Sequence, residues 1–463
     1  MDELVIGPKV QAVRAAGRAW AARPLPERLR VIASARRLIA REAEALGATV
    51  PRPLADTLAA EVLPLAEAAL FLLRAAPGLL RPRRLRRGRP LWLLGVQAEI
   101  RREPRGAVLI VGPGNYPLFL PGAQAMQALA AGNGVCVKPA PGASAPMRAL
   151  ADLLRRAGLP EGVFGVLEEH AGPAAVQAGF DFIVLTGGAE TGISVLQQAA
   201  TTLTPTAMEL SGVDAVFVLP GADLTTLASA LAYGLRLNNG ATCIAPRRVF
   251  VPEPMQAELL ALLLARLPMP AAVPVPVAAR LADLAAEAQS QGARVAARNP
   301  TVLAGARPEM RLLQEDVFAP WLALVPVASP ETALDAAEAC RYALGASVWG
   351  PTAAARDIAA RVRAGSVCVN DLIVPTADPR LPFGGRSRSG FGVTRGAEGL
   401  LEMTVPKAIS VRTGRFRPHL DATLSGDPGK LLAMIRLLHG GWKDALALLF
   451  RARLLDRDRP ASK

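Results

Sequence analysis

One of the four cysteines lies in a loop whose composition suits nucleophilic chemistry. Cys243 follows the polar segment 238–242, where Gly240 leaves the backbone free to approach a substrate. Upstream, Glu209 lies in the segment 208–212. Acyl transfer by a thiol needs a thiolate, donors for the oxyanion, and a base that activates water. Cys243 and Glu209 are therefore candidates for the nucleophile and the base.

The other three cysteines have a simpler interpretation. Cys136, Cys340 and Cys368 lie in ordinary apolar surroundings, and free cysteine is most often a small buried hydrophobe. The same interpretation applies to Cys243 when it is taken alone, so its assignment depends on the residues around it.

Two scarce residue types follow short apolar runs. Lys138 is the only lysine between Lys9 and Lys407, and it ends the run 134–137. Asn115 follows the run 107–111, where its side-chain amide can donate to a developing oxyanion. The alternatives are a solvent-exposed lysine and an asparagine selected for its turn geometry.

Length and composition exclude several classes of protein. A chain of 463 residues, 51% of them hydrophobic, can form two or three domains with large cores. Its cysteines have no metal-binding or disulfide spacing, which suits a reducing cytosol, and three scattered histidines argue against zinc or histidine-based catalysis. We predict no metal site.

The charge pattern and the terminal sequence exclude further classes of protein. The net charge of +14 comes from dispersed arginines with only 4% aromatic residues, which indicates a solvated surface rather than specific nucleic-acid binding. The N-terminus has no signal-peptide pattern, and no apolar run is long enough for a confident transmembrane helix. We expect a cytoplasmic protein, with peripheral membrane contact left open.

The order of elements predicts two α/β domains. Residues 8–80 have helical spacing, whereas apolar runs at 107–111, 134–137, 163–167 and 181–185 alternate with helical stretches, as in a doubly wound parallel sheet. Ligands bind such sheets at the carboxyl ends of the strands, where Asn115, Lys138 and the glycine-containing loop 186–192 are expected. That loop precedes a helix, so its amides can face a pyrophosphate.

A second α/β block runs from about 214 to 395, with strands expected at 215–219, 249–251 and 321–327 and a helix at 255–266. Residues 81–88 are interpreted as a basic loop and 91–102 as part of a hairpin arm. The proline- and alanine-rich stretch 268–300 shows little sign of chemistry.

Together these segments resemble the aldehyde dehydrogenase superfamily over residues 100–410. The blocks that carry the resemblance follow the family's order at plausible spacings. They are residues 112–117, 132–133 with 138–139, 185–188, 209–212, 238–243, 315–320, and 382–385 with 389–390.

The resemblance implies a fold of two doubly wound α/β domains with a small oligomerisation arm. The dinucleotide-binding domain would comprise 1–91 and 105–212, and the domain with the nucleophilic cysteine 213–395. The arm would comprise 92–104 and 396–411, followed by an extension at 412–463. A homodimer or homotetramer is implied.

The resemblance also implies roles for matching residues. Cys243 matches the nucleophile, Glu209 the general base, and Asn115 the side-chain oxyanion donor. The implied contacts to NAD or NADP are Lys138, Pro113, Thr186, Gly187, Gly188, Gly192, Asp316 and Phe318.

Some positions depart from the family pattern. Asp316 is one methylene shorter than the usual glutamate, and Glu315 could substitute only if the backbone shifted. Gly188 and Ala241 replace a common serine and glutamine. Pro141 stands where some NAD-preferring members place a ribose-binding glutamate, so NADP is permitted.

The predicted activity is oxidation of a small-molecule aldehyde to a carboxylate, with hydride transfer to NAD(P). The alternatives are an acyl-CoA-linked or reductive member of the superfamily, which Glu209 argues against, and a non-catalytic scaffold. Beyond the resemblance, residues 428–455 form two amphipathic segments around Gly440, with apolar and basic residues that suit either packing or an anionic membrane surface.

Overall fold

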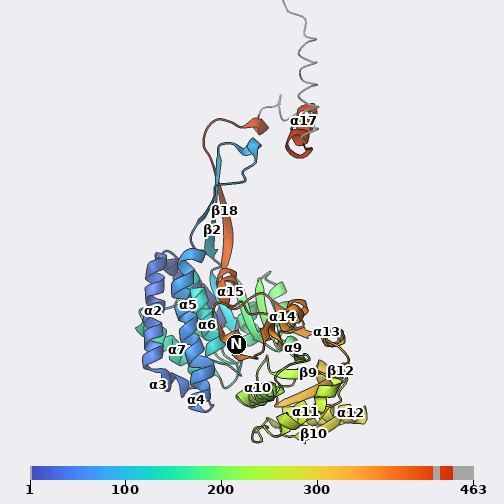
Figure 1. Cartoon of the computed structure of the whole chain (residues 1–463). Helices are drawn as coiled ribbons and strands as arrows, with labels where there is room; N and C mark the ends of the chain where they lie inside the picture. The colour runs from blue at the N-terminus through green and yellow to red at the C-terminus, as the bar shows by residue number, and fades with distance from the viewer. Residues whose placement is uncertain (1–2, 421–427, 442–463) are drawn as a thin grey trace, which may run out of the picture. The chain divides into compact units, whose positions relative to one another are not determined.

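The computed structural model describes residues 3–420 and 428–441 (Figure 1). Its internal contacts divide the chain into two compact units. Unit 1 comprises the chain up to Arg81 together with Arg102–Pro406, and unit 2 comprises Pro82–Arg101 and the chain from Lys407 onward. The candidate site lies entirely within unit 1.

The first sheet of unit 1 has six strands in the order β17-β7-β6-β3-β4-β5, parallel except for β17. It confirms the predicted doubly wound arrangement, because both of its faces are buried. Along β3, Val108 and Ile110 join one core cluster while Leu109 and Val111 join another. The strands are β3 (Ala107–Val111), β4 (Gly134–Lys138), β5 (Phe164–Val166), β6 (Phe182–Gly187), β7 (Thr206–Leu210) and β17 (Gly390–Phe391).

Helices cover both faces of this sheet. The N-terminal helices and α6 and α7 form the core on one face, whereas α8, α9 and part of α1 pack on the other. The helices are α1 (Glu3–Ala21), α2 (Leu25–Arg41), α3 (Ala43–Gly47), α4 (Leu54–Thr57), the π-helical turn η1 (Leu58–Val62), α5 (Leu63–Leu79), α6 (Phe119–Ala131), α7 (Ser144–Arg156), α8 (Gly172–Gln177) and α9 (Ala189–Ala200).

The second sheet has seven strands in the order β10-β11-β12-β9-β8-β14-β15, and all its pairs except β10–β11 are parallel. Its strands are β8 (Asp214–Val218), β9 (Pro246–Pro252), β10 (Arg294–Arg298), β11 (Thr301–Ala304), β12 (Trp321–Val327), β14 (Gly345–Trp349) and β15 (Ser366–Val369). Its helices are α10 (Leu224–Arg236), α11 (Glu253–Leu264), α12 (Val275–Ser290), α13 (Pro330–Glu338) and α14 (Thr352–Arg361).

The stretch 268–300 is more regular than its composition indicated. It contains α12 and β10, with Leu281 and Leu284 buried in the core. Prolines that look like helix breakers lie at the start of α12, where a missing N–H costs nothing and the fixed φ favours the first turn.

Short elements connect the two sheets and the site. They are η3 (Leu237–Gly240), η4 (Arg311–Gln314), β13 (Tyr342–Ala343), η5 (Val374–Ala377), β16 (Arg386–Ser387) and α15 (Gly396–Glu402). Leu400 of α15 is fully buried in the core of unit 1.

Unit 2 is built on a three-stranded sheet in the order β1-β2-β18. Its elements are β1 (Arg83–Leu85), η2 (Leu91–Leu93), β2 (Val96–Pro104), β18 (Thr404–Arg412), η6 (Pro418–Leu420) and α17 (Pro428–His439). β1 lies in the segment predicted as a basic loop. The bounds of unit 2 also differ from the predicted arm, since residues 396–406 belong to unit 1.

Helix α17 corresponds to the first predicted amphipathic segment, and the second lies outside the described residues. Within the ranges that the structure describes, no helix is long and apolar enough to cross a membrane.

Candidate active site

Strand pairing places Glu209 between β6 and β17 of the first sheet. Glu209 is near the carboxyl end of β7, with Thr186 of β6 on one side and Gly390 of β17 on the other. Its side chain is 2% exposed, and Thr394 donates its hydroxyl proton to Oε2. Among the described residues, none forms a hydrogen bond with the buried Oε1 of Glu209, so this oxygen keeps an unused acceptor position.

The loop that carries Cys243 has an unusual backbone. Asn238, Asn239 and Gly240 all have left-handed φ angles, of 50°, 52° and 72°. At Gly240, a Cβ atom would lie 2.5 Å from the backbone of Ala319, so only glycine fits. The buried Arg247 donates from Nη1 to the Ala319 carbonyl at 2.6 Å and from Nη2 to the Gly240 carbonyl at 2.5 Å, which holds the loop in place.

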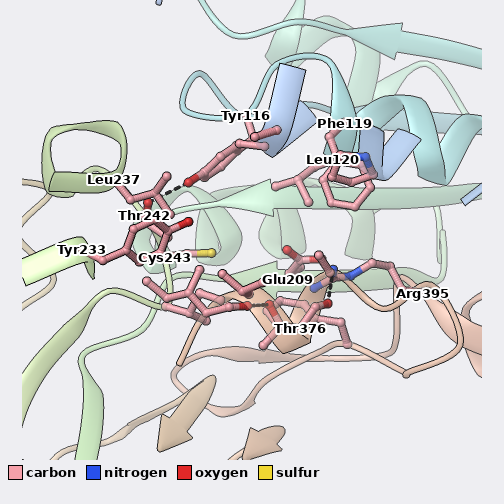
Figure 2. Close-up of a pocket in the computed structure, with 18 residues that line it drawn as sticks. Tyr116, Phe119, Leu120, Glu209, Tyr233, Leu237, Thr242, Cys243, Thr376 and Arg395 are labelled. Atoms are coloured by element: carbon pink, nitrogen blue, oxygen red, sulfur yellow. Dashed lines mark hydrogen bonds between the residues drawn. The ribbon is translucent and has the colours of Figure 1, made fainter. Parts of the chain in front are cut away.

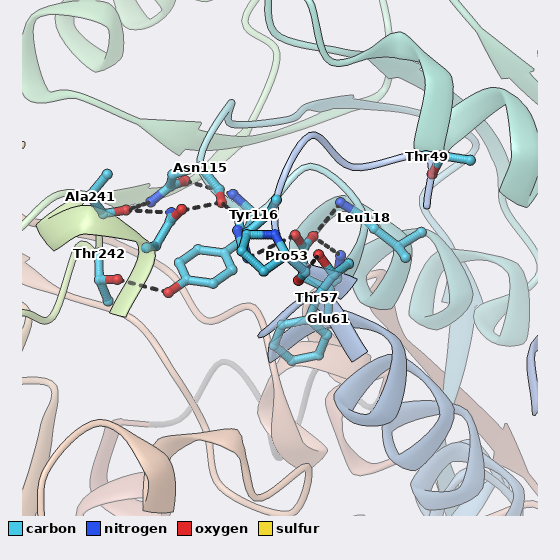
Figure 3. Close-up of polar contacts among 12 residues, drawn as sticks. Thr49, Pro53, Thr57, Glu61, Asn115, Tyr116, Leu118, Ala241 and Thr242 are labelled. Carbon is cyan, nitrogen blue, oxygen red and sulfur yellow. Dashed lines mark hydrogen bonds and ion pairs between the residues drawn. The ribbon is translucent and has the colours of Figure 1, made fainter. Parts of the chain in front are cut away.

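Asn115 reaches this loop from the other sheet. Its Nδ2 donates to the Ala241 carbonyl at 3.0 Å, and Asn238 donates to the same oxygen and to the Asn115 carbonyl, each at 3.0 Å. The hydroxyls of Tyr116 and Thr242 bond to each other at 2.7 Å (Figure 3). The Asn115 amide is thus held against the backbone of Ala241, which precedes Cys243 by two positions in the chain.

A buried ion pair supports the turn that carries Asn115. Nη1 of Arg52 lies 3.3 Å from Oε1 of Glu61. Oε2 of Glu61 accepts hydrogen bonds from the backbone N–H groups of Leu118 at 2.7 Å and Phe119 at 3.1 Å (Figure 3). Arg52 also donates to the Asn115 carbonyl. Burial raises the pKa of Glu61, while Arg52 and the two N–H donors lower it.

Two cavities meet at Cys243 and Glu209. The first, of about 980 Å³, lies against the carboxyl ends of the strands in the first sheet. Its lining comprises Val111, Gly112, Pro113, Gly114, Asn115, Leu120, Lys138, Ala140, Pro141, Leu185, Thr186, Gly187, Gly188, Thr191, Glu209, Leu210, Ser211, Cys243 and Phe318.

The first cavity fits a dinucleotide. A Cβ atom on Gly188 would meet nothing within 4 Å, so this residue leaves open space just before the N-terminus of α9. Lys138 is half-buried at the end of β4, and burial lowers its pKa while Glu169 raises it. These residues would hold the phosphates and the adenosine ribose.

Most of the predicted cofactor contacts line this cavity, namely Pro113, Lys138, Thr186, Gly187, Gly188 and Phe318. Gly192 does not; it is buried in α9, where a Cβ would lie 2.8 Å from the side chain of Leu210. Gly192 thus allows α9 to pack closely behind the cavity.

Asp316 is also outside the lining, and burial raises its pKa to about 6. The neighbouring Glu315 is no substitute for it. Nη2 of Arg280 lies 2.6 Å from Glu315 Oε1, and Nη2 of Arg311 lies 3.1 Å from the same atom. Both ion pairs hold Glu315 at the surface.

The second cavity, of about 660 Å³, shares Cys243 and Glu209 with the first and is drawn in Figure 2. It is mainly apolar and aromatic. Its lining comprises Ala59, Ala60, Pro64, Tyr116, Phe119, Leu120, Glu209, Tyr233, Leu237, Thr242, Cys243, Ile244, Ile373, Val374, Thr376, Ala377, Phe383 and Arg395.

Burial and charge set the protonation of the two central groups. Burial raises the pKa of the Cys243 thiol, Glu209 raises it further, and Arg395 lowers it. Burial likewise raises the pKa of Glu209, which Arg395 and Thr394 lower. Burial and the Glu209 carboxylate therefore favour the neutral thiol, whereas the Arg395 guanidinium favours the thiolate that chemistry at Cys243 requires.

Sequence reasoning missed several of these residues. Arg395 and Thr394 follow the block 389–390, but arginine is common throughout the chain and neither residue stands out. The Arg52–Glu61 pair lies in a helical region that carried no functional signal. Strand pairing and helix packing alone reveal that these residues lie near Glu209 and Asn115.

Cys243 and Glu209 lie between a large cavity at the carboxyl ends of the strands and an apolar cavity, an arrangement that suits a nucleophile placed between a cofactor and a substrate. Comparison with known proteins identifies the class: the model of the aldehyde dehydrogenase family matches residues 6–409. The chain belongs to the aldehyde dehydrogenase family, and it is an NAD(P)-dependent enzyme.

The chain is 30% identical to a 4,4'-diapolycopene aldehyde oxidase from a Methylomonas species, over 87% of this chain and 81% of the relative. It is 31% identical to a Mycobacterium tuberculosis protein provisionally named succinate-semialdehyde dehydrogenase (NADP+) 2, over 86% and 82% of the two chains.

Among solved structures, the NADP-dependent glyceraldehyde-3-phosphate dehydrogenase of Bacillus halodurans in complex with NADP superposes with a TM-score of 0.81 at 27% identity. The match covers 89% of this chain and 92% of that one.

Proposed function

We propose that the enzyme oxidises an aldehyde to a carboxylate through covalent bonds to Cys243. The position of Cys243 carries the proposal, since its thiol lies where the two cavities meet and can contact substrate on one side and cofactor on the other. The thiolate attacks the aldehyde carbon and forms a thiohemiacetal. A nicotinamide cofactor held in the first cavity would supply the hydride acceptor, and loss of hydride from this carbon would leave a thioester on Cys243.

Asn115 is the proposed side-chain donor to the oxygen that becomes negative in this step. Its amide is positioned by hydrogen bonds, so little reorganisation is needed when charge develops. The Arg52–Glu61 pair keeps the turn in place.

Glu209 is the proposed base for hydrolysis of the thioester. Glu209 lines both cavities and its Oε1 has no partner among the described residues, so in this proposal the carboxylate takes a proton from a water that attacks the acyl carbon. This base argues against an acyl-CoA-linked or reductive enzyme, in which the thioester must survive. A non-catalytic scaffold would have no use for Cys243, Glu209 and Asn115 in one place.

The direct test is reduction of NAD and NADP with a panel of short, long and aromatic aldehydes. Reduced cofactor formed in step with free carboxylate supports the proposal. Formation of an acyl-CoA instead, or no turnover with any aldehyde, contradicts it.

Cofactor preference provides a further prediction. Among the residues that the structure describes, no carboxylate lines the cavity beside Lys138 and Pro141, so discrimination against NADP should be weak. The nearby Glu169 is engaged with the backbone N–H groups of Gly142 at 2.7 Å and Ser144 at 3.1 Å.

Pro141→Glu should shift the ratio of kcat/KM for NAD over NADP by about tenfold toward NAD, because it places a negative charge near the 2′ position. Pro141→Gln is the matched neutral control. Strong rejection of NADP by the parent enzyme would show that another residue reads the ribose.

Assembly and location are also proposals. The sheet of unit 2 is proposed as an oligomerisation arm that forms a homodimer or homotetramer. The enzyme is proposed to act in the cytoplasm.

We further propose that residues 428–455 bind the surface of an anionic membrane. Helix α17 has no buried residue within the described part of the chain, and Leu432, Ile435 and Leu437 are each more than half exposed. Lys430 and Arg436 on this helix, with several basic residues further on, supply positive charge.

Sedimentation with anionic and neutral vesicles, with and without residues 415–463, tests this proposal. The full chain should sediment with anionic vesicles, and high salt or truncation should release it. Equal binding by both forms, or none by either, contradicts the proposal. Loss of solubility or assembly on truncation would indicate packing against the protein instead.

A further inference from the structure

The second cavity has two charged side chains among its lining residues, Glu209 and Arg395. The rest of its wall is aliphatic, aromatic or hydroxyl-bearing. Figure 2 shows Arg395 close to Glu209, opposite the apolar residues Phe119 and Leu120. The role of this buried arginine decides which aldehydes the cavity can accept.

The hydrogen bond and the ring contacts of the Arg395 guanidinium are with neutral groups. Its side chain is largely buried, and Nη1 donates to the Thr376 carbonyl at 2.5 Å. The guanidinium lies 4.0 Å from the ring centre of Phe383 and 5.7 Å from that of Phe119. Carbonyl and aromatic contacts reduce the cost of burying a cation, but they do not neutralise its charge.

The carboxylate of Glu209 is the negative charge that acts on the Arg395 guanidinium. The pairing of β17 with β7 brings residues 390–395 beside Glu209, so that Thr394 bonds to its Oε2 and Arg395 acts on it electrostatically. Burial raises the pKa of Glu209, and the Arg395 guanidinium is the largest opposing influence. A buried carboxylate and a buried guanidinium in the same wall stabilise each other's charged forms.

Other charged groups near the site have partners elsewhere. Arg52 pairs with Glu61, and Arg247 donates to backbone carbonyls around the Cys243 loop. Asp214 and Asp316 raise the pKa of the Cys243 thiol. Among the described residues, Arg395 is the charged group that lowers the pKa of Glu209.

From this arrangement, and on the basis of the proposed function, we infer that Arg395 is the counter-charge of the base Glu209. The substrate cavity therefore takes an uncharged, apolar aldehyde. Arg395 is a positioning residue in this account, since it acts through Glu209.

An aldehyde with a second, negatively charged end would be a poor substrate. The pair of Glu209 and Arg395 is neutral overall, so a carboxylate that enters finds no free cation and must lose its hydration. An alkyl or aryl group instead buries its surface against Tyr116, Phe119 and Tyr233.

Matched aldehydes test the substrate class. Butanal and succinate semialdehyde have the same chain length and differ by a terminal carboxylate, and octanal extends the apolar series. We expect kcat/KM to rise from butanal to octanal and to be at least about tenfold lower for succinate semialdehyde than for butanal. A preference for succinate semialdehyde would overturn the inference.

Substitution of Arg395 tests its role. In Arg395→Met the low-pH limb of kcat for octanal should move up by about one pH unit or more, because Glu209 loses the charge that favours its ionised form. Arg395→Lys should keep the parent profile, and Arg380→Met, at an exposed ion pair, is the control. If Arg395→Met raises KM for succinate semialdehyde alone and leaves the pH profile unchanged, Arg395 anchors a substrate carboxylate and the inference fails.

Stability measurements separate this inference from the proposed function. Thermal unfolding of Glu209→Gln, Arg395→Met and the double variant forms a cycle that requires no activity. Each single variant leaves one buried charge unpaired, so the double variant should be less destabilised than the sum of the two. Additive losses would contradict the pairing even if aldehyde oxidation is confirmed, whereas coupling in an inactive protein would contradict only the proposed function.

Discussion

Replacement of Cys243 with alanine is expected to reduce steady-state aldehyde oxidation by about 10⁴-fold or more. In the proposed mechanism the thiol makes the covalent bond to the substrate, and no other cysteine contributes to the lining of either cavity. Binding of NAD and NADP should change little, because the dinucleotide contacts lie mainly on the first sheet. The measurement is steady-state reduction of cofactor together with a binding titration.

Two of the other cysteines provide matched controls. Cys340 and Cys368 are buried free thiols, and their alanine variants should retain turnover once any loss of stability is taken into account. Steady-state turnover by Cys243→Ala at the parent rate would rule out the covalent mechanism.

Replacement of Glu209 with glutamine is expected to separate hydride transfer from hydrolysis. The variant keeps the shape of the side chain and an oxygen that can accept from Thr394, but it removes the base. A first turnover should still release a burst of reduced cofactor, with an amplitude near one per active site. Steady-state turnover should then be about 10² to 10⁴-fold slower than in the parent enzyme.

The pH dependence of the parent enzyme follows from the same group. Burial raises the pKa of Glu209, so the base becomes protonated as the pH falls through that value and the hydrolysis rate declines with it. Glu209→Gln should lose this limb of the profile. Glu287→Gln, at a surface ion pair with Arg311, is a suitable control, and an unchanged steady-state rate in Glu209→Gln would mean that another residue activates the water.

The sequence was sufficient to predict the fold class, and it singled out the residues that line the two cavities at their junction. Buried strands at 107–111 and 134–137 are continuous apolar runs because both faces of the sheet are covered, and this pattern is local. Cys243, Glu209, Asn115 and Lys138 stand at strand ends or in polar loops, where their residue types are unusual. The family resemblance then gave these four residues their roles.

Only the tertiary structure showed which residues surround them. Arg395 is 186 positions from Glu209, and it comes close because a two-residue strand adds to the edge of β7. The Arg52–Glu61 pair meets the Asn115 turn through helix packing, and Gly192 proves to be a packing position behind the cavity. Such contacts depend on the three-dimensional pairing of distant segments, and burial then decides how strongly each charge acts. The local sequence contains neither the contacts between distant segments nor the burial of each charge. The electrostatic environment of the proposed base and the apolar character of the second cavity therefore emerged from the fold alone.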